Sequence, residues 1–208
     1  MAVPADPLPL DLAALLTSRV CHDLISPVGA IGNGLEVLDE DESGEMRDVA
    51  LDLIRASART ASTRLQFARM AFGYGGSAGA EIDLGEAEKV ARAYVESERT
   101  ALAWTLQPGF MAKDRVKLLL VLVALAAQVI PRGGSVTAAV AGDRLTATAT
   151  GPMLRPQAGL AGLLAGTPEA PLDAHTIVAF YAGLVARQCG LAATITRDGD
   201  VVVLAAAP

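Results

Sequence analysis

Apolar residues repeat with helical spacing in two long stretches near the start of the chain. In the first they recur every three or four positions, at Leu24, Val28, Ile31, Leu35 and Leu38. The second has the same rhythm, at Leu51, Ile54, Ala58, Ala61, Leu65, Ala68 and Phe72. This spacing places the apolar side chains on one face of an α-helix. The acidic residues 39–42 and Gly44 lie between the stretches and predict a turn. We therefore predict a helical hairpin over residues 1–73.

A single hairpin of this kind cannot bury both apolar faces by itself. Two copies could bury them together as a four-helix bundle. Packing against the rest of the same chain is the alternative. We expect a homodimer built on a four-helix bundle.

The rest of the chain has a different pattern. A glycine-rich, aperiodic stretch over residues 74–82 predicts a linker, and residues 83–208 alternate helical and extended patterns. The helices are expected over residues 84–99, 113–130 and 174–188. A strand is expected over 101–107, with hairpins joining 135–140 to 145–150 and 192–197 to 201–206. The second part is thus expected to be an α/β sandwich, and the whole chain belongs to the α+β class.

One polar stripe crosses the first predicted helix opposite its apolar face. It consists of small or polar residues at Ser18, His22, Ser26, Gly29, Asn33 and Glu36. A histidine on such a stripe is accessible, and neutral imidazole is a good nucleophile near neutral pH. Phosphoryl transfer mainly requires positioning and charge neutralisation, which one well-placed histidine can serve. An ordinary surface histidine is the alternative interpretation.

The residues around His22 resemble the phosphoacceptor box of two-component histidine kinases. Such a box has a histidine, an acid, a leucine, a variable residue, a small polar residue, a proline and an apolar residue, matched here by residues 22–28. The resemblance implies that His22 carries a phosphoryl group. It also implies that Asp23 orients the imidazole or accepts its proton, and that Ser26 has a lesser role. Ile25 stands where a generic kinase box has a basic residue, which argues against an autokinase.

The second part resembles the Bergerat-type ATP-binding domain of the same kinases, in a degenerate form. A Pro-x-Gly-Gly motif is present at residues 131–134, but Val121 and Leu125 stand where those kinases have two asparagines. Ala149 replaces the aspartate that reads adenine, and the glycine pair of the nucleotide lid is absent from residues 174–178. Apolar side chains offer no oxygen to a phosphate-bound metal. We expect the domain to keep its fold but to lack an ATP site. We also expect this chain to bind no cofactor.

A histidine hairpin joined to a degenerate kinase domain resembles the ChpT-type histidine phosphotransferases of alphaproteobacterial phosphorelays. The match is strongest over residues 18–36 and 65–73. It implies a cytoplasmic homodimer that takes a phosphoryl group from the receiver-domain aspartate of a hybrid kinase and passes it through His22 to response regulators. The regulators named for this family, CtrA and CpdR, govern the cell cycle, and Mg²⁺ is expected from the partner's receiver domain. A non-catalytic scaffold or antagonist that docks receiver domains, or an active histidine kinase, are the alternatives.

A receiver domain has to reach His22, so neighbouring helix residues are expected to form the interface. An arginine beside His22 could offset charge on the moving phosphoryl group, although a solvated helix arginine is the alternative for each one. The candidates for partner binding are Ser18, Arg19, Asn33, Arg59 and Arg64.

Composition excludes some classes of function. A net charge of −6 argues against nucleic-acid binding, which favours a basic face. The N-terminal residues lack the basic region of a signal peptide, and the apolar run 118–127 is shorter than the ~20 residues that cross a bilayer. Cys21 and Cys189 fall in separate predicted domains, so we expect no disulfide framework, and a reducing cytosol is compatible with both cysteines. We interpret His175 as a surface or structural histidine.

Overall fold

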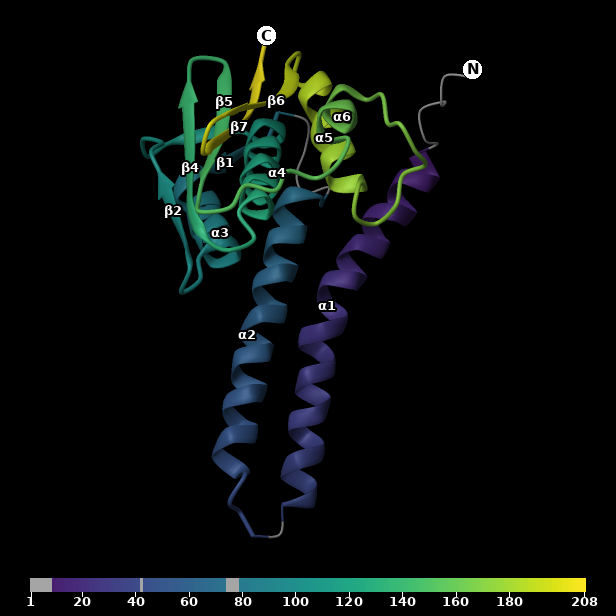
Figure 1. The fold of residues 1–208 in the computed structure, drawn as a ribbon, viewed down its shortest axis with the longest axis vertical. Coiled ribbons are helices and arrows are strands. Elements are labelled where there is room, and N and C mark those ends of the chain that lie inside the picture. The colour runs from purple at the N-terminus through teal and green to yellow at the C-terminus, as the bar shows by residue number, and fades with distance from the viewer. Residues whose placement is uncertain (1–8, 42, 74–78) are drawn as a thin grey trace.

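The chain folds into a long helical hairpin that projects from an α/β domain (Figure 1). The computed structural model describes residues 9–41, 43–73 and 79–208. Helix α1 spans Pro9–Glu40 and α2 spans Arg47–Ala71. The predicted linker falls mostly on residues 74–78, which lie outside the described residues. Within the rest of that range, strand β1 already occupies Glu81–Asp83.

The predicted turn between the two helices is organised by one carboxylate. The side chain of Asp41 accepts hydrogen bonds from the backbone N–H groups of Gly44 and Met46, both at 2.9 Å, and from the hydroxyl of Ser43 at 2.8 Å. These bonds, that from Ser43 first, lower the pKa of Asp41 because they favour its charged form. The bonded turn reverses the chain, so the helices run antiparallel, as predicted.

The two helices approach each other closely on one side of the hairpin. A Cβ atom at Gly34 would lie only 2.7 Å from Cγ1 of Ile54 and 3.3 Å from the carbonyl oxygen of Ala50. Glycine is therefore needed at this contact. Helix α1 runs without interruption through Pro27, and Figure 1 shows it leaning away from α2 as it nears the α/β domain.

The apolar face of α1 is partly buried within the chain and partly exposed to solvent. Leu24, Ile31 and Leu38 are half-buried, whereas Val28 is 55% exposed and Leu35 is 50% exposed. Helix α2 has a matching set of exposed apolar residues at Val49, Leu53 and Leu65. Packing within one chain thus covers only part of the apolar surface that the sequence pattern predicts.

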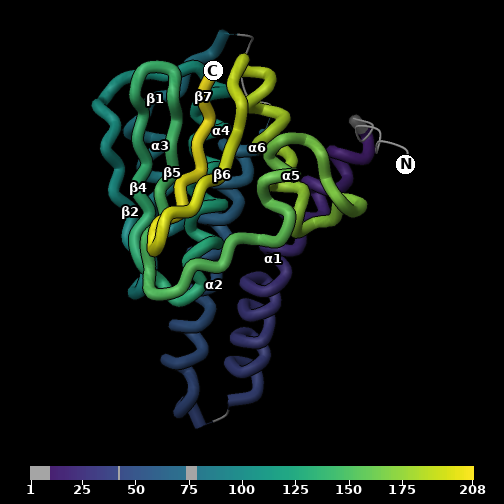
Figure 2. The backbone as a smooth tube through the Cα atoms, turned by 45° about the horizontal axis from the view of Figure 1, so that its top comes forward, coloured from purple at the N-terminus to yellow at the C-terminus, as the bar shows by residue number. Residues whose placement is uncertain are grey.

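The α/β domain has one five-stranded sheet backed by helices. The strand order is β2-β4-β5-β7-β6, with β2 and β4 parallel and all other neighbours antiparallel. Figure 2 shows the strands in front of α3 and α4, and α6 packs beside α4. The bounds are β2 Thr100–Trp104, β4 Gly134–Ala141, β5 Arg144–Thr150, β6 Ala192–Asp198, β7 Val201–Ala207, α3 Leu84–Val95, α4 Lys113–Val129 and α6 Ile177–Gln188.

The predicted helices and both hairpins are present, and three short elements were not predicted. They are β1, its antiparallel partner β3 (Phe110–Ala112), and α5 (Leu160–Ala165). Two predicted helices are shorter than expected. Helix α3 ends at Val95 because the next residue, Glu96, has an extended backbone. Helix α6 begins only at Ile177, after a hydrogen-bonded turn described below.

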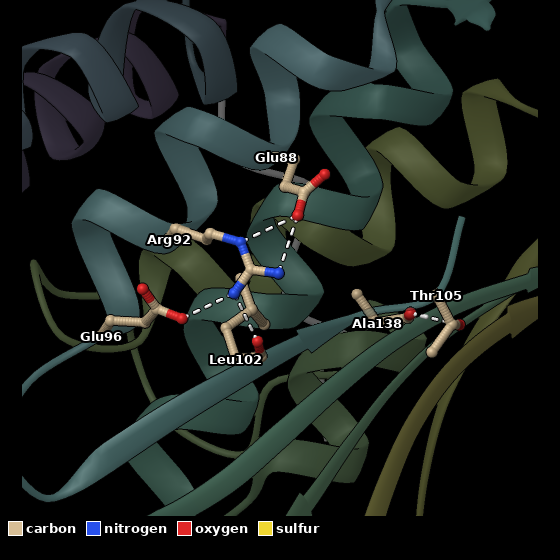
Figure 3. Close-up of polar contacts among 6 residues, drawn as sticks. All are labelled: Glu88, Arg92, Glu96, Leu102, Thr105 and Ala138. Atoms are coloured by element: carbon tan, nitrogen blue, oxygen red, sulfur yellow. Dashed lines mark hydrogen bonds and ion pairs between the residues drawn. The ribbon is translucent and has the colours of Figure 1, made fainter. Parts of the chain in front are cut away.

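Helix α3 is held against the sheet by Arg92. Its guanidinium group donates to Glu88 at 2.8 Å, to Glu96 at 2.7 Å and to the backbone carbonyl of Leu102 in β2 at 2.7 Å (Figure 3). The hydrogen bonds to the two carboxylates, that to Glu88 first, raise the pKa of Arg92. This contact matters for the site because α3 also carries Tyr94.

Helix α4 runs through the centre of the domain and is buried almost all round. Val121 is fully buried and Leu125 is 3% exposed, and both pack in the main hydrophobic core together with Ala149 of β5. These are the three positions at which the kinase resemblance leads one to expect polar nucleotide-binding groups. No helix among the described ranges is both long enough and apolar enough to cross a membrane.

The Gly-Gly pair after α4 has a structural role in this domain. Gly133 has a φ of +90°, and a Cβ atom there would collide with the backbone carbonyl of Arg99. A Cβ atom at Gly134 would collide with the carbonyl oxygen of Thr150 in β5. The close approach of the strands therefore requires both glycines, whether or not a nucleotide is bound.

Candidate functional site

His22 lies in the middle of α1, at an open groove between the two helices of the hairpin. Its side chain is 58% exposed, and the groove has a volume of about 380 Å³. The groove is lined on the α1 side by His22, Asp23, Ser26, Pro27 and Ala30, and on the α2 side by Ala56, Ser57, Thr60 and Arg64. The predicted polar stripe of α1 is exposed along its length.

Asp23 is the centre of a charged network beside His22. Its carboxylate makes a bidentate ion pair with Arg19. Nε of Arg19 lies 3.0 Å from Oδ2 of Asp23, and Nη2 lies 3.0 Å from Oδ1. Nη1 of Arg64 lies 3.7 Å from the same carboxylate, and Nδ1 of His22 lies 3.6 Å from it. The Asp23 side chain is only 16% exposed, so these contacts are partly shielded from water. The carboxylate thus faces one nitrogen of the imidazole while two arginines fix its position.

The α/β domain reaches this network through Tyr94 of α3. The ring of Tyr94 stacks on Phe67 of α2, with centroids 3.8 Å apart and planes 20° apart. Tyr94 and Arg19 line the same groove, and the charge of Arg19 acts on the Tyr94 hydroxyl. Burial raises the pKa of Tyr94, and the negative charge of Asp23 raises it further. The sequence analysis did not identify Tyr94, because nothing in the local pattern of α3 distinguishes it from a core aromatic residue.

A second group of aromatic contacts fixes α6 against the end of α2. Phe72 packs edge-to-face on Phe67, with centroids at 6.2 Å, and on Tyr181 of α6, at 5.5 Å. The Tyr181 hydroxyl donates to the backbone carbonyl of Ala71 at 3.2 Å. Burial raises the pKa of Tyr181 to about 12, and the charge of Asp114 contributes. Helix α6 therefore has a defined position relative to the hairpin.

The turn that precedes α6 places His175 next to His22. The two imidazole rings lie 5.3 Å apart between centroids, with their planes at 78°. Asp173 holds the turn by accepting from the backbone N–H groups of His175 at 2.9 Å and Thr176 at 2.8 Å, and from the Thr176 hydroxyl at 2.8 Å. The bonds from Thr176, its backbone N–H before its hydroxyl, lower the pKa of Asp173 most. His175 is exposed, as expected, but its position beside the candidate nucleophile was not predicted.

The other candidate residues occupy several places on the hairpin. Arg59, together with Arg19 and Arg64, lines a second groove of about 1010 Å³ between α2 and the α3 region. Ser18 and Asn33 are exposed on α1 and line neither groove. Within the part of the chain that the structure describes, no group of three or more His, Cys, Asp or Glu residues is placed to hold a metal ion.

Comparison with known proteins identifies the family. The family described as "Histidine phosphotransferase C-terminal domain" matches residues 84–201. The protein phosphotransferase ChpT of Brucella abortus (strain 2308) is 43% identical, over 99% of this chain and all of that protein. The chain belongs to the ChpT-type histidine phosphotransferases. It is a phosphotransferase, and the resemblance predicted from its sequence is confirmed.

One solved structure agrees with this assignment over its whole length. This phosphotransferase superimposes on a bacterial phosphotransferase with a TM-score of 0.85, at 41% identity, over 99% of its chain and all of the other. The histidine kinase AdeS of Acinetobacter baumannii gives a TM-score of 0.43 at 10% identity, over 89% of this chain and 95% of that one. The expected fold, a helical hairpin followed by an α/β domain, is confirmed.

The anchoring of α6 gives a prediction about pH. Tyr181→Phe removes the hydrogen bond to Ala71 and should lower the free energy of unfolding by about 1 kcal/mol at neutral pH. In the wild type, Tyr181 stays protonated up to about pH 12 in the folded state, whereas an unfolded tyrosine ionises near pH 10. Its contribution to stability is thus complete below pH ~10 and is lost as the pH rises towards 12. Urea unfolding of both proteins from pH 7 to 12 measures this. A wild-type advantage that does not shrink above pH 10 would contradict the assignment.

Proposed function

We propose that this phosphotransferase carries the phosphoryl group on His22, between the receiver-domain aspartate of a hybrid histidine kinase and that of response regulators. The observation that carries the proposal is the pairing of an exposed imidazole with a fixed carboxylate. Nδ1 of His22 faces Asp23 at 3.6 Å, and Arg19 holds that carboxylate in place. A proton on Nδ1 leaves the lone pair on Nε2, which is the nitrogen available for attack. Such contacts tighten when a substrate binds.

The transfer is a pair of in-line displacements. Nε2 attacks the phosphorus atom of the aspartyl phosphate, and the bond from phosphorus to the carboxylate oxygen breaks and returns its electron pair to the receiver. Asp23 stabilises the positive charge that develops on the imidazole, or accepts the Nδ1 proton. A carboxylate oxygen of the next receiver then attacks the same phosphorus. The P–Nε2 bond breaks and its electron pair returns to Nε2, while any proton held by Asp23 returns to Nδ1. No water enters, so the phosphoryl group is conserved.

The charges around the grooves favour a receiver domain as the partner. The active site of a receiver contains carboxylates and a phosphoryl group, and Mg²⁺ from the receiver neutralises part of this charge. Arg59 and Arg64 offer further positive charge beside the groove that contains His22. Ser18, Arg19 and Asn33 complete the proposed contact surface. The family points to regulators similar to CtrA and CpdR, to cell-cycle control and to the cytoplasm.

The buried apolar residues of α4 support a phosphotransferase without autokinase activity. Val121, Leu125 and Ala149 occupy the core where a nucleotide site would need polar groups, and they provide no ligand for phosphate or metal. A scaffold that only docks receivers remains the second candidate, because a kinase-like surface can bind without reacting.

Transfer of a phosphoryl group through His22 distinguishes the phosphotransferase from the scaffold and from an active kinase. We expect a receiver domain phosphorylated with labelled phosphate to label the wild type, and the label to move to a second receiver. His22→Ala should abolish both steps and leave receiver affinity within a few-fold, because the ring is exposed at the groove surface. Label reaching the second receiver through His22→Ala would favour the scaffold. Label appearing on the wild type from ATP and Mg²⁺ alone would favour an active kinase.

Asp23→Asn tests the role of the carboxylate. The amide keeps the shape of the side chain but loses its charge, so the transfer rate should fall by more than ~10-fold, as for general acid–base groups. The matched control is Asp52→Asn on α2, an exposed aspartate that pairs with Arg55 at 3.2 Å, away from His22. Rapid-quench kinetics with phosphorylated receiver gives both rates. Equal rates for the two variants would reduce Asp23 to a structural charge.

The exposed apolar stripe of the hairpin supports the proposal of a homodimer. Leu35 and Leu65 are each half exposed, and Val28, Val49 and Leu53 extend the same uncovered set. A second hairpin would cover these residues and complete a four-helix bundle.

Leu65→Glu should separate the proposed dimer because it places a charge in the bundle. The control is Phe110→Glu, which changes a comparably exposed apolar residue in β3, far from the hairpin stripe. Light scattering should give twice the chain mass for the wild type and the control, and a reduced mass for Leu65→Glu. A monomeric wild type at micromolar concentration would refute the bundle.

A further inference from the structure

Two contacts restrain the ring of His22, and they come from different domains. Nδ1 faces Asp23 on the same helix, and the ring plane meets the imidazole of His175 from the α/β domain at 5.3 Å and 78°. That separation and angle are typical of an edge-to-face aromatic pair. The final torsion of a histidine side chain has a broad energy minimum, so an exposed ring needs such contacts to keep one orientation.

The backbone of His175 is held in place by the turn that carries it. Three hydrogen bonds to the Asp173 carboxylate close its turn, and the backbone N–H of Asp173 donates to the Thr176 hydroxyl at 2.8 Å. Helix α6, which follows directly, is held to α2 through Tyr181. The backbone position from which the His175 side chain extends is thus set by both the turn and the packing of the α/β domain on the hairpin.

From this geometry we infer that His175 is a positioning residue for the phosphotransfer. Its ring holds the imidazole of His22 with Nδ1 towards Asp23, which keeps Nε2 directed at the incoming phosphorus. It gains no bond and loses none in the reaction. This inference rests on the proposed role of His22, and it gives the α/β domain a part in the reaction that requires no nucleotide.

Three variants of the full chain test the inference. His175→Ala removes the ring, and the turn should persist because it uses the backbone N–H of that residue. His175→Phe keeps an aromatic ring of similar reach but no titratable nitrogen. Glu169→Ala is the control, an exposed residue in the same connection between α5 and α6. Each is compared with the wild type in single-turnover transfer from a labelled receiver domain, at saturating receiver, and in receiver affinity.

We expect His175→Ala to slow transfer about 5-fold, the scale of one edge-to-face contact, with receiver affinity unchanged within 2-fold. His175→Phe should retain at least half of the wild-type rate, and Glu169→Ala all of it. ¹⁵N NMR of labelled histidine should show a smaller Nδ1–H population at His22 in His175→Ala, and a restored one in His175→Phe. A purely structural residue would not change this tautomer ratio selectively.

Several results would overturn the inference. They are a wild-type rate and tautomer ratio in His175→Ala, a rate in His175→Phe as low as in His175→Ala, or a loss of receiver affinity that accounts for the whole effect. The NMR measurement needs no phosphate donor, so it separates this inference from the proposed function. If the wild type accepts no label, the proposed function fails. If it accepts label and His175→Ala behaves as the wild type, only the role of His175 fails.

Discussion

The stacking of Phe67 on Tyr94 is the contact on which the arrangement of the site depends. These rings join α2 to α3 face to face at 3.8 Å, and Phe72 extends the same packing to Tyr181 of α6. Through Tyr94 the α/β domain reaches Arg19, which holds the Asp23 carboxylate. Through α6 it places His175 beside His22. The hairpin carries the candidate nucleophile, but the surroundings of that nucleophile come from both domains.

The α/β domain is apolar inside at the positions where the kinase resemblance leads one to expect nucleotide-binding groups. Its central helix is apolar on almost all sides, with Val121 and Leu125 inside the core. The glycine pair of the Pro-x-Gly-Gly motif is required here by close contacts with Arg99 and Thr150. Arg92 fixes α3 to the sheet and so gives Tyr94 a defined position. Under the proposed function, the domain supports the site instead of supplying ATP.

Much of this structure could be predicted from sequence, because it depends on local patterns. The three-four apolar rhythm indicated both long helices, and alternation around Gly142 and Gly199 indicated the two β-hairpins. The strands β1 and β3 have three residues each, too few for a periodic pattern. The positions of Tyr94 and His175 could not be predicted, because they depend on how two distant segments pack on the hairpin. The split of the apolar face of α1 between α2 and solvent depends likewise on the packing angle of the helices.

The most direct test of the account is to map the phosphorylated atom. The wild-type protein would be incubated with a phosphorylated receiver domain, and the product analysed by ³¹P NMR and by mass spectrometry of its peptides at alkaline pH. The account predicts one phosphohistidine, on Nε2 of His22, and none on His175 although its ring lies 5.3 Å away. A phosphoryl group on His175, on Nδ1 of His22 or on no histidine would contradict it.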